Sequence, residues 1–328
     1  MDLTRFPIDR ADFDGPVLVT GAGGCIGSWA LAILTRAGVP AVAFDLSDDK
    51  RRPLLLMTEK ELAQVPWRTG DIADTAAVAD VVAEHGIRAI IHLAALQVPF
   101  CKADPAAGAR ANVVGTVNVL EAARCHGLRR LAYASSIAAH SFLPGTAWLA
   151  TLYGAYKLCD EMIAHTYAAD WQVPSIGLRP GVVYGVGRDQ GLTSKTTLAI
   201  LAAAAGQPYT VPFSGAVSAL HAGEVASAFI KAVAQQREGA HVFDINGRAT
   251  SVEAWLDIVR GLAPGAELRV EGDALPFPAA LSDAPVQRHL GDYGPVPLDE
   301  GIAETLEDFR RLLAAGALSP EAVAPAAS

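Results

Sequence analysis

The feature that most limits the fold of this 328-residue chain is a glycine-rich segment near its amino terminus. It reads T-G-A-G-G-C-I-G at residues 20–27, directly after an apolar run at residues 17–19 and directly before a helical pattern at residues 28–37. Glycine permits a tight turn and close packing of a helix on a strand, because it has no side chain to obstruct either. The segment therefore predicts the first strand, turn and helix of a β-α-β unit.

Short apolar runs alternate with helical patterns through the first half of the chain. Runs rich in Val, Ile and Leu occur at residues 17–19, 41–44, 89–91, 131–133 and 175–178, and helical patterns intervene, for example at residues 76–84 and 111–124. Strands that alternate with helices form parallel sheets covered on both faces, with right-handed crossovers. We expect an α/β fold, a Rossmann-type doubly wound parallel sheet with a smaller C-terminal substrate lobe.

The glycine-rich segment is suited to bind the pyrophosphate of a dinucleotide. The free N–H groups and the positive dipole end of the following helix face such a ligand, and the glycines let the backbone approach it. Asp45 ends the second predicted strand, where its carboxylate would accept the ribose hydroxyls and repel a 2′-phosphate. We expect NAD rather than NADP, bound by Asp45 and by the turn residues Gly21, Gly24, Cys25, Ile26 and Gly27.

Other interpretations of this region stay open. The segment could be an ordinary glycine-rich turn with Asp45 as a simple strand-end residue, and the basic residues at 50–52 could still receive a phosphate. Asp71, which precedes Ile72 after the third predicted strand, could bond the adenine amino group or cap the helix that begins near Asp74.

A further cofactor contact is expected after the fourth strand. Leu93, Ala94 and Ala95 follow that strand, and their mostly small side chains would let the backbone pass close to the cofactor. His92, which precedes them, is expected to be a hydrogen-bonded structural histidine rather than a catalyst.

A second group of polar residues falls at the same predicted edge of the sheet. Ser136 follows the fifth strand, and Tyr153 and Lys157 lie four residues apart, on one face of the next helix. A free tyrosine has a pKa of about 10, and a nearby cation stabilises its phenolate. We predict Tyr153 as the acid/base that exchanges a proton with a substrate hydroxyl, Lys157 as the cation, and Ser136 as a hydrogen-bond partner of the same oxygen.

By itself the Tyr/Lys spacing also fits a half-buried aromatic residue with a solvated lysine. The order along the chain favours the catalytic interpretation, because the glycine turn, the serines and the Tyr/Lys pair converge at the carboxyl edge of a doubly wound sheet, where such folds bind ligands.

Composition excludes several classes of protein. The chain is 51% apolar and carries a formal net charge of −9, which allows a large core and argues against a nucleic-acid partner. Its amino terminus lacks the pattern of a signal peptide, and the apolar stretch at residues 198–205 is far below the roughly 18 residues of a membrane span. Four cysteines lack disulfide or metal-ligand spacing and are expected to be small core residues. We expect a cytoplasmic protein with neither metal nor membrane contact.

These motifs together resemble the extended short-chain dehydrogenase/reductase family, also called the NAD-dependent epimerase/dehydratase family. The resemblance covers residues 16–313 and includes G-D-I at 70–72, H-L-A-A at 92–95, N-V-V-G-T at 112–116, S-S at 135–136, Y-x-x-x-K at 153–157 and L-R-P-G-V-V-Y-G at 178–185. It implies bound NAD, commonly a homodimer formed by two helices of each subunit, and an active site of Ser136, Tyr153 and Lys157 with Asn112 nearby.

The family also suggests how the chain is divided. We expect an NAD-binding domain at residues 1–180, with a contribution from about residues 217–247. The substrate lobe would comprise residues 181–216 and 248–328, with a disordered C-terminal tail.

Departures from the family pattern bear on the substrate. Ile137 and Ala138 stand where the dehydratases of this family carry an acidic pair, so dehydration is disfavoured. Nucleotide-sugar enzymes place an arginine near the position of Val217, and a second one where this chain has its Pro-rich residues 275–285, and neither is found here. A small polyhydroxy substrate without a nucleotide fits better. Polar loop residues that could line its pocket are Arg188, Asp189, Gln190, Thr193, Ser194 and Lys195.

The predicted activity is an NAD-dependent dehydrogenase acting on a secondary alcohol or ketone. The alternative is an epimerase that oxidises a carbinol transiently and uses the same residues. A non-enzymatic dinucleotide sensor is a third class, and it would not need the Tyr/Lys pair.

Overall fold

A seven-stranded parallel sheet forms the centre of the computed structural model, which describes residues 3–143, 146, 148–276 and 278–323. The chain crosses from one half of the sheet to the other between β3 and β4, so the order reverses between β1 and β4. From edge to edge the strands are β10 (Ala240–Ile245), β6 (Ser175–Pro180), β5 (Leu131–Ala134), β4 (Ala89–His92), β1 (Val17–Thr20), β2 (Ala41–Asp45) and β3 (Trp67–Thr69).

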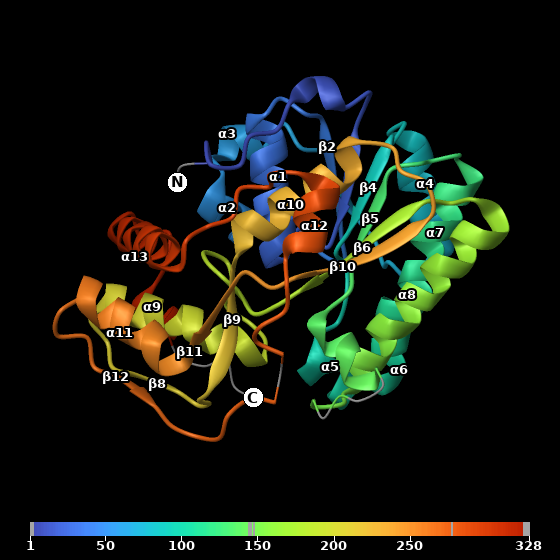
Figure 1. Ribbon diagram of the computed structural model, residues 1–328. Coiled ribbons are helices and arrows are strands. Elements are labelled where there is room, and N and C mark those ends of the chain that lie inside the picture. The colour runs from blue at the N-terminus through green and yellow to red at the C-terminus, as the bar shows by residue number, and fades with distance from the viewer. Residues whose placement is uncertain (1–2, 144–145, 147, 277, 324–328) are drawn as a thin grey trace.

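Helices cover both faces of this sheet, which confirms the predicted doubly wound fold (Figure 1). The apolar strand residues alternate between two cores, one shared with α1 and α10 and the other with α4, α7 and α8. The helices of this part are α1 (Cys25–Arg36), α2 (Arg51–Leu56), α3 (Glu59–Leu62), α4 (Thr75–Glu84), α5 (Val98–Ala103), α6 (Pro105–Ala109), α7 (Gly115–Cys125), α8 (Leu152–Trp171), α10 (Ala222–Ala234) and α12 (Ala284–Leu290).

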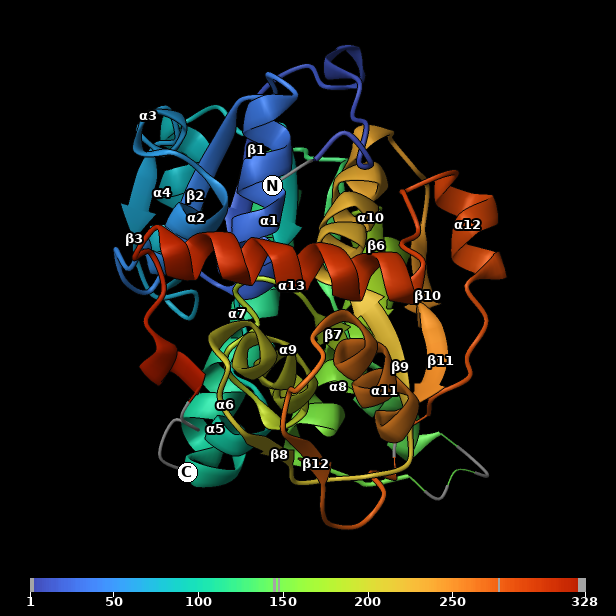
Figure 2. The same ribbon diagram turned by 90° about the vertical axis from the view of Figure 1, so that its left-hand side faces the viewer.

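A second group of elements lies beyond the carboxyl ends of the central strands (Figures 1 and 2). It holds a three-stranded sheet of β11 (Arg248–Ser251), β9 (Ala216–His221) and β7 (Val183–Tyr184) and a two-stranded sheet of β12 (Leu268–Val270) and β8 (Tyr209–Val211). Its helices are α9 (Lys195–Ala205), α11 (Val252–Leu262) and α13 (Leu298–Ala314).

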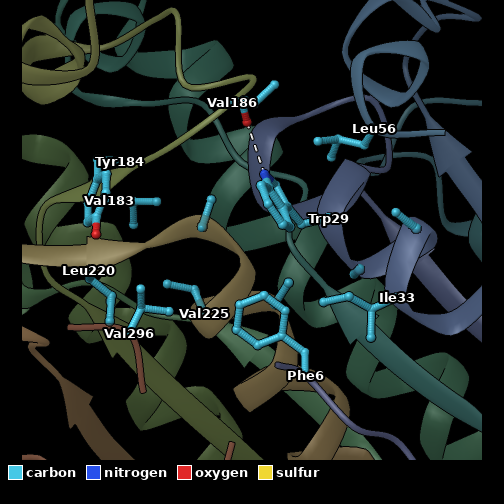
Figure 3. Close-up of a cluster of buried hydrophobic side chains, with 14 of the residues drawn as sticks. Phe6, Trp29, Ile33, Leu56, Val183, Tyr184, Val186, Leu220, Val225 and Val296 are labelled. Carbon is cyan, nitrogen blue, oxygen red and sulfur yellow. Dashed lines mark hydrogen bonds between the residues drawn. The ribbon is translucent and has the colours of Figure 1, made fainter. Parts of the chain in front are cut away.

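An aromatic cluster joins the two groups of elements (Figure 3). Trp29 on α1 packs edge-on against Phe6, at 6.3 Å between ring centroids, and against His221, at 5.0 Å. The indole N–H of Trp29 donates to the carbonyl oxygen of Val186 at 2.9 Å, which attaches the loop after β7 to α1. Burial lowers the pKa of His221 to about 3, so this ring packs as a neutral group.

Three expectations from the sequence differ from the structure. The helical stretch predicted at residues 111–124 begins as a π-helical turn, Arg110–Val114, in which the side-chain amide of Asn112 donates to the carbonyl oxygen of Gly108. In the predicted disordered tail, Pro320–Val323 form a 3₁₀ helix whose Val323 is buried, and the rest of the tail, 324–328, lies outside the described residues.

The cysteines also differ from the expectation. Only Cys101 is a fully buried core residue, whereas Cys125 is exposed at the end of α7. Cys25 and Cys159 are half-buried. None of the described helices is both long and apolar enough to cross a bilayer.

Candidate active site

A cavity lies at the carboxyl ends of β1, β4 and β5, beside the point where the strand order reverses. Ligands bind at this place in doubly wound sheets, because the loops diverge there and leave a crevice. Nine of the predicted catalytic and cofactor-binding residues line it, as do Arg188 and Thr193 of the predicted substrate pocket. The lining consists of Gly21, Gly24, Cys25, Ile26, Gly27, Leu93, Ala95, Gln97, Val98, Pro99, Ala134, Ser135, Ser136, Ile137, Ala138, Tyr153, Pro180, Gly181, Val182, Val183, Arg188, Leu192 and Thr193.

The glycine turn is shaped so that side chains are not tolerated. Gly21 has a φ of +67°, and a Cβ there would lie 2.7 Å from the backbone nitrogen of Ala94. A Cβ on Gly27 would lie 2.3 Å from the carbonyl oxygen of Gly21. Helix α1 begins after Gly24, which contributes no side-chain cap, so the first N–H groups of the helix are available toward the cavity. This bare cradle of backbone at a helix N-terminus fits a pyrophosphate.

Asp45 contacts the turn directly. Its Oδ2 accepts a hydrogen bond from the N–H of Gly23 at 2.9 Å, at the end of β2. The basic residues that follow are engaged elsewhere. Arg51 pairs with Asp49 at 2.6 Å, Arg52 pairs with Asp189 at 2.7 Å, and the ammonium of Lys50 lies 5.3 Å from the ring centre of Trp67.

The segment after β3 does not line the cavity. Asp71 is exposed, and its Oδ1 accepts a hydrogen bond from the N–H of Ala73 at 2.9 Å. Asp74, not Asp71, caps α4 by accepting from two N–H groups of the first turn, so the capping alternative for Asp71 is wrong. Ile72 is buried, and a Cβ on Gly115 would lie 2.9 Å from its Cγ2.

A hydrogen-bonded chain fixes the loop after β4. The hydroxyl oxygen of Thr20 accepts from the N–H groups of Leu93 and Ala94, at 3.1 and 3.3 Å. His92 bonds Thr20 through Nδ1 at 2.8 Å and Thr116 through Nε2 at 3.3 Å. Burial lowers the pKa of His92 to about 3, so it is a neutral, hydrogen-bonded structural residue, as the sequence predicted. Leu93 and Ala95 line the cavity, whereas Ala94 does not.

Tyr153 and Ser136 both line the cavity. Ser136 caps the short 3₁₀ helix Ile137–Phe142, and its Oγ accepts from the N–H of Ala138 at 3.1 Å, which leaves the hydroxyl proton to donate. Lys157 lies one turn further along α8, with its ammonium 5.8 Å from the ring centre of Tyr153. The sequence therefore placed these three residues in one neighbourhood.

Sequence reasoning missed the partner of Lys157. The Nζ atom of Lys157 lies 3.2 Å from Oδ2 of Asp160, and both side chains are buried. Burial raises the pKa of Asp160 to about 6, although Lys157 and Thr116 act to lower it. The three-residue spacing of Lys157 and Asp160 on one helix was the available signal.

Asn112 is close to this group without reaching the cavity. Its amide nitrogen donates to the carbonyl oxygens of Gly108, at 2.9 Å, and Leu96, at 3.2 Å. The side chain is fully buried, and its backbone carbonyl accepts from the Thr116 hydroxyl at 2.7 Å. Asn112 thus links α6, the loop after β4 and α7.

A second buried charge network lies behind the serines and was not apparent from the sequence. The Ser135 hydroxyl bonds Glu161, whose carboxylate is held by Arg179 through Nε at 2.7 Å and Nη2 at 2.5 Å. Arg179 also lies 3.6 Å from Asp244, which bonds His140 at 2.6 Å. These residues come from five separate segments, so only the fold brings them together.

A glycine cradle at the N-terminus of α1 and an acidic residue at the end of β2 are typical of a dinucleotide-binding α/β fold, and the cavity at its switch point is also lined by a tyrosine of α8. The chain belongs to the NAD dependent epimerase/dehydratase family, whose model matches residues 17–246. This confirms the family resemblance noted in the sequence.

The individual relatives share about a third or less of their residues with this chain. The chain is 32% identical over 180 residues to a UDP-glucose 4-epimerase of Mus musculus, a match that covers 50% of this chain and 52% of the mouse protein. It is 28% identical to MoeE5 in complex with UDP-glucose and NAD, with a TM-score of 0.74 over 91% of this chain and 100% of that one. A GalE-like L-threonine dehydrogenase from Cupriavidus necator shares the fold, with 24% identity and a TM-score of 0.75 over 91% and 99% of the two chains.

The chain spans about half the length of the curated relatives it matches first. The family model establishes the family. The particular reaction and substrate are inferred from the geometry of the site.

Proposed function

We propose that this protein is an NAD-dependent dehydrogenase that transfers a hydride between NAD and a secondary alcohol or ketone of a small polyhydroxy substrate. One observation supports it most directly: Tyr153, Ser136 and the glycine turn at Gly21–Gly27 line the same cavity. A substrate bound in this cavity could therefore contact both the Tyr153 phenol, which would exchange the proton, and the cofactor held at the glycine turn.

Each residue has a role that follows from its position. Tyr153 takes the substrate's hydroxyl proton during oxidation and returns it during reduction. Lys157 favours the phenolate through its charge, because an opposite charge nearby stabilises an ionised group. Ser136 donates a hydrogen bond to the substrate oxygen and fixes its orientation. When bound, NAD supplies the hydride acceptor.

NAD would be held by the turn and the neighbouring loops. Gly21, Gly24, Cys25, Ile26 and Gly27 would contact its pyrophosphate, and Asp45 its adenosine ribose. Leu93 and Ala95 would lie beside it, with Ala94 in the same loop. We retain Asp71 and Ile72 as adenine contacts, and Asn112 as a positioning residue for the loop after β4.

The substrate is proposed to lack a nucleotide. MoeE5 was solved with UDP-glucose, yet in this chain Gly215, Ala216 and Val217 offer no cationic side chain before the rest of β9. Ile137 and Ala138, which line the cavity, are apolar, so no carboxyl group is present there to promote dehydration. A compact sugar or polyol derivative matches this lining best.

The nearest alternative is an epimerase, because several relatives are named UDP-glucose 4-epimerase. Purified protein is incubated with NAD and a panel of sugars, aldonic acids and polyols while NADH absorbance is followed. Net accumulation of NADH supports a dehydrogenase. Conversion of the substrate with retained cofactor and no net NADH assigns the epimerase, and binding of NAD without any conversion assigns the sensor.

We also propose that the protein is a cytoplasmic homodimer with the domain boundaries expected from the sequence. A homodimer would cover exposed apolar side chains on α5 and α8 and just before α7, namely Phe100, Met162, Trp171 and Val114. Sedimentation velocity tests this. The four free thiols agree with a cytoplasmic location. The domain limits at residues 180, 217 and 247 remain a prediction that limited proteolysis can test.

A further inference from the structure

Arg188 is the one charged residue in the lining of the cavity, within the part of the chain that the structure describes. It follows β7 in the loop that leads to α9, and it faces the same space as Tyr153 and Ser136. Burial lowers the pKa of Arg188, whereas the ionisable groups of Cys25, Tyr153 and Asp189 raise it.

Among the described residues, no carboxylate lies within 4.0 Å of this guanidinium, so it forms no ion pair. Its Nη1 and Nη2 atoms make only long hydrogen bonds, to Oε1 of Gln97 at 3.5 Å and to Oγ1 of Thr193 at 3.3 Å. Its Nε atom is buried and has no partner in the described structure. The adjacent carboxylate of Asp189 pairs instead with Arg52, at 2.7 Å. A desolvated cation without an anion is costly, so an anionic ligand would stabilise it.

The loop that carries Arg188 is held in place. The carbonyl oxygen of Val186 accepts from the Trp29 indole at 2.9 Å (Figure 3). The Arg188 N–H donates to the carbonyl oxygen of Gly185 at 3.1 Å. Gly191 faces the Gln97 side chain so closely that a Cβ there would lie 2.2 Å from Oε1. The guanidinium is thus presented from a packed turn, which lowers the entropy cost of binding through it.

The hydrogen-bonding groups around Arg188 match a carboxylate. A guanidinium offers parallel N–H groups to the two oxygens of one carboxylate, and the long bonds of Nη1 and Nη2 to Gln97 and Thr193 leave both atoms able to bond a stronger acceptor. The Thr193 hydroxyl accepts from Arg188 and so keeps its own proton to donate. One uncompensated positive charge balances a monoanion, whereas a diphosphate would add charge for which the rest of the lining has no cation.

We propose that Arg188, with Thr193, binds the carboxylate of a hydroxy acid substrate whose secondary alcohol is presented to Tyr153 and Ser136. The proposal rests on the proposed function and narrows its substrate from polyhydroxy compounds in general to hydroxy carboxylates such as sugar acids. Arg188 acts as a specificity-determining residue, since it would bind the substrate at a group that does not react.

The test compares matched ligands that differ only at the anionic group. Gluconate is paired with glucitol and threonate with threitol, so that each carboxylate is set against a primary alcohol on the same carbon chain. NADH production gives kcat/KM, and quenching of NADH fluorescence in the loaded protein gives affinity independently of turnover. The variants are Arg188→Gln, Arg188→Lys and the control Lys195→Gln, which removes a nearby charge outside the lining.

We expect the wild type to prefer the carboxylates by at least about tenfold, and Arg188→Gln to lose that preference while its affinity for NAD stays within about twofold. Arg188→Lys should retain part of the preference for carboxylates, because an ammonium keeps the positive charge but lacks the two parallel N–H groups of a guanidinium. Lys195→Gln should behave as the wild type does.

Each other outcome has a defined meaning. Equal use or binding of acids and alcohols, or a preference that survives Arg188→Gln, overturns the inference and leaves the dehydrogenase proposal intact. A loss of NAD affinity with no change in ligand preference assigns Arg188 to the cofactor pyrophosphate and also overturns it. Carboxylate-selective binding without any turnover supports the inference and counts against the dehydrogenase.

Discussion

The ammonium of Lys157 lies 3.2 Å from the carboxylate of Asp160, and neither side chain is more than 2% exposed. The same ammonium is 5.8 Å from the ring centre of Tyr153. The cation that is proposed to favour the Tyr153 phenolate is therefore shared with a buried carboxylate. How strongly Lys157 acts on Tyr153 depends on the charge of Asp160, because an adjacent anion offsets the field of the ammonium.

Replacement of Asp160 by Asn should move the pH dependence of alcohol oxidation. Without the carboxylate, the charge of Lys157 acts fully on Tyr153, and the kcat/KM profile of oxidation should move to lower pH. The variant should also be less stable by about 3–5 kcal/mol, because it leaves a buried charge unpaired. Rates between pH 6 and pH 10 and urea denaturation would measure the two effects.

Asp170→Asn is the matched control, since Asp170 lies exposed on the same helix. It should change neither the profile nor the stability. A folded Asp160→Asn protein with an unmoved or raised titration would show that Lys157 does not set the ionisation of Tyr153.

Replacement of Tyr153 by Phe should remove turnover and spare cofactor binding. The variant keeps the aromatic ring but has no proton to exchange, so kcat should fall by about 10²–10⁴-fold. The affinity for NAD should stay within about threefold, because the turn and Asp45 supply most of the proposed cofactor contacts. Stopped assays of NADH formation and fluorescence titration with NADH measure these quantities separately.

Tyr156→Phe is the control on the same helix. The Tyr156 hydroxyl donates to the carbonyl oxygen of Pro105 at 3.0 Å and does not line the cavity. Its loss should cost about 1 kcal/mol of stability and leave the rate intact. Full activity in Tyr153→Phe would refute the proposed acid/base.

Local patterns in the sequence were sufficient to predict the central fold. The glycine turn, the alternating strands and the Tyr/Lys spacing each involve residues of one β-α-β unit or one helix turn. Such residues are close together in the sequence, so their pattern can be recognised there. Ser136, Tyr153 and the turn residues accordingly lie around one cavity. The π-helical turn at Arg110–Val114 was missed, because the apolar spacing of the sequence there follows a regular helical pattern.

Long-range charge pairing was beyond the sequence. Glu161 and Arg179 meet because α8 packs against β6, and Arg52 and Asp189 meet across 137 positions of sequence. Neither composition nor periodicity indicates which acidic residue pairs with which basic residue. For the same reason the polar cluster at residues 188–195 could be recognised, but the singular position of Arg188 in the cavity could not.

Replacement of Gly27 by Ala should damage the cofactor site. The added Cβ would lie 2.3 Å from the carbonyl oxygen of Gly21, and this neighbour is backbone rather than a movable side chain. The turn must shift, so the affinity for NAD should fall by about tenfold or more and the melting temperature should drop. Isothermal titration with NAD and thermal denaturation would check both effects.

Gly261→Ala serves as its control. Gly261 lies in α11 with open space around the position of a Cβ, so alanine should stabilise the helix by up to about 1 kcal/mol and leave NAD binding unchanged. Equal NAD affinity in Gly27→Ala and the wild type would show that the pyrophosphate does not bind at this turn.

Glu224 should make the protein less stable as the pH rises. Its side chain is 2% exposed, and its Oε2 accepts from the N–H of Val296 at 3.1 Å. Burial raises the pKa of Glu224 from its ordinary 4.5 to about 8, although the bond from Val296 acts to lower it. Between these two values the folded protein keeps a proton that the unfolded chain has lost. The free energy of unfolding contributed by this group therefore falls as pH rises from about 4.5 to 8.

Glu224→Gln removes the titration and keeps an oxygen to accept from Val296. Because each pKa unit corresponds to about 1.4 kcal/mol, the variant should gain stability relative to the wild type with rising pH, by several kcal/mol between pH 5 and pH 8.5. Urea denaturation across this range measures the difference, in which all other titrating groups cancel. Glu253→Gln, at an exposed position in the first turn of α11, should show no such trend. If the stabilities of Glu224→Gln and the wild type run parallel with pH, Glu224 is ionised in the folded protein throughout the range, and its burial is compensated by groups other than Val296.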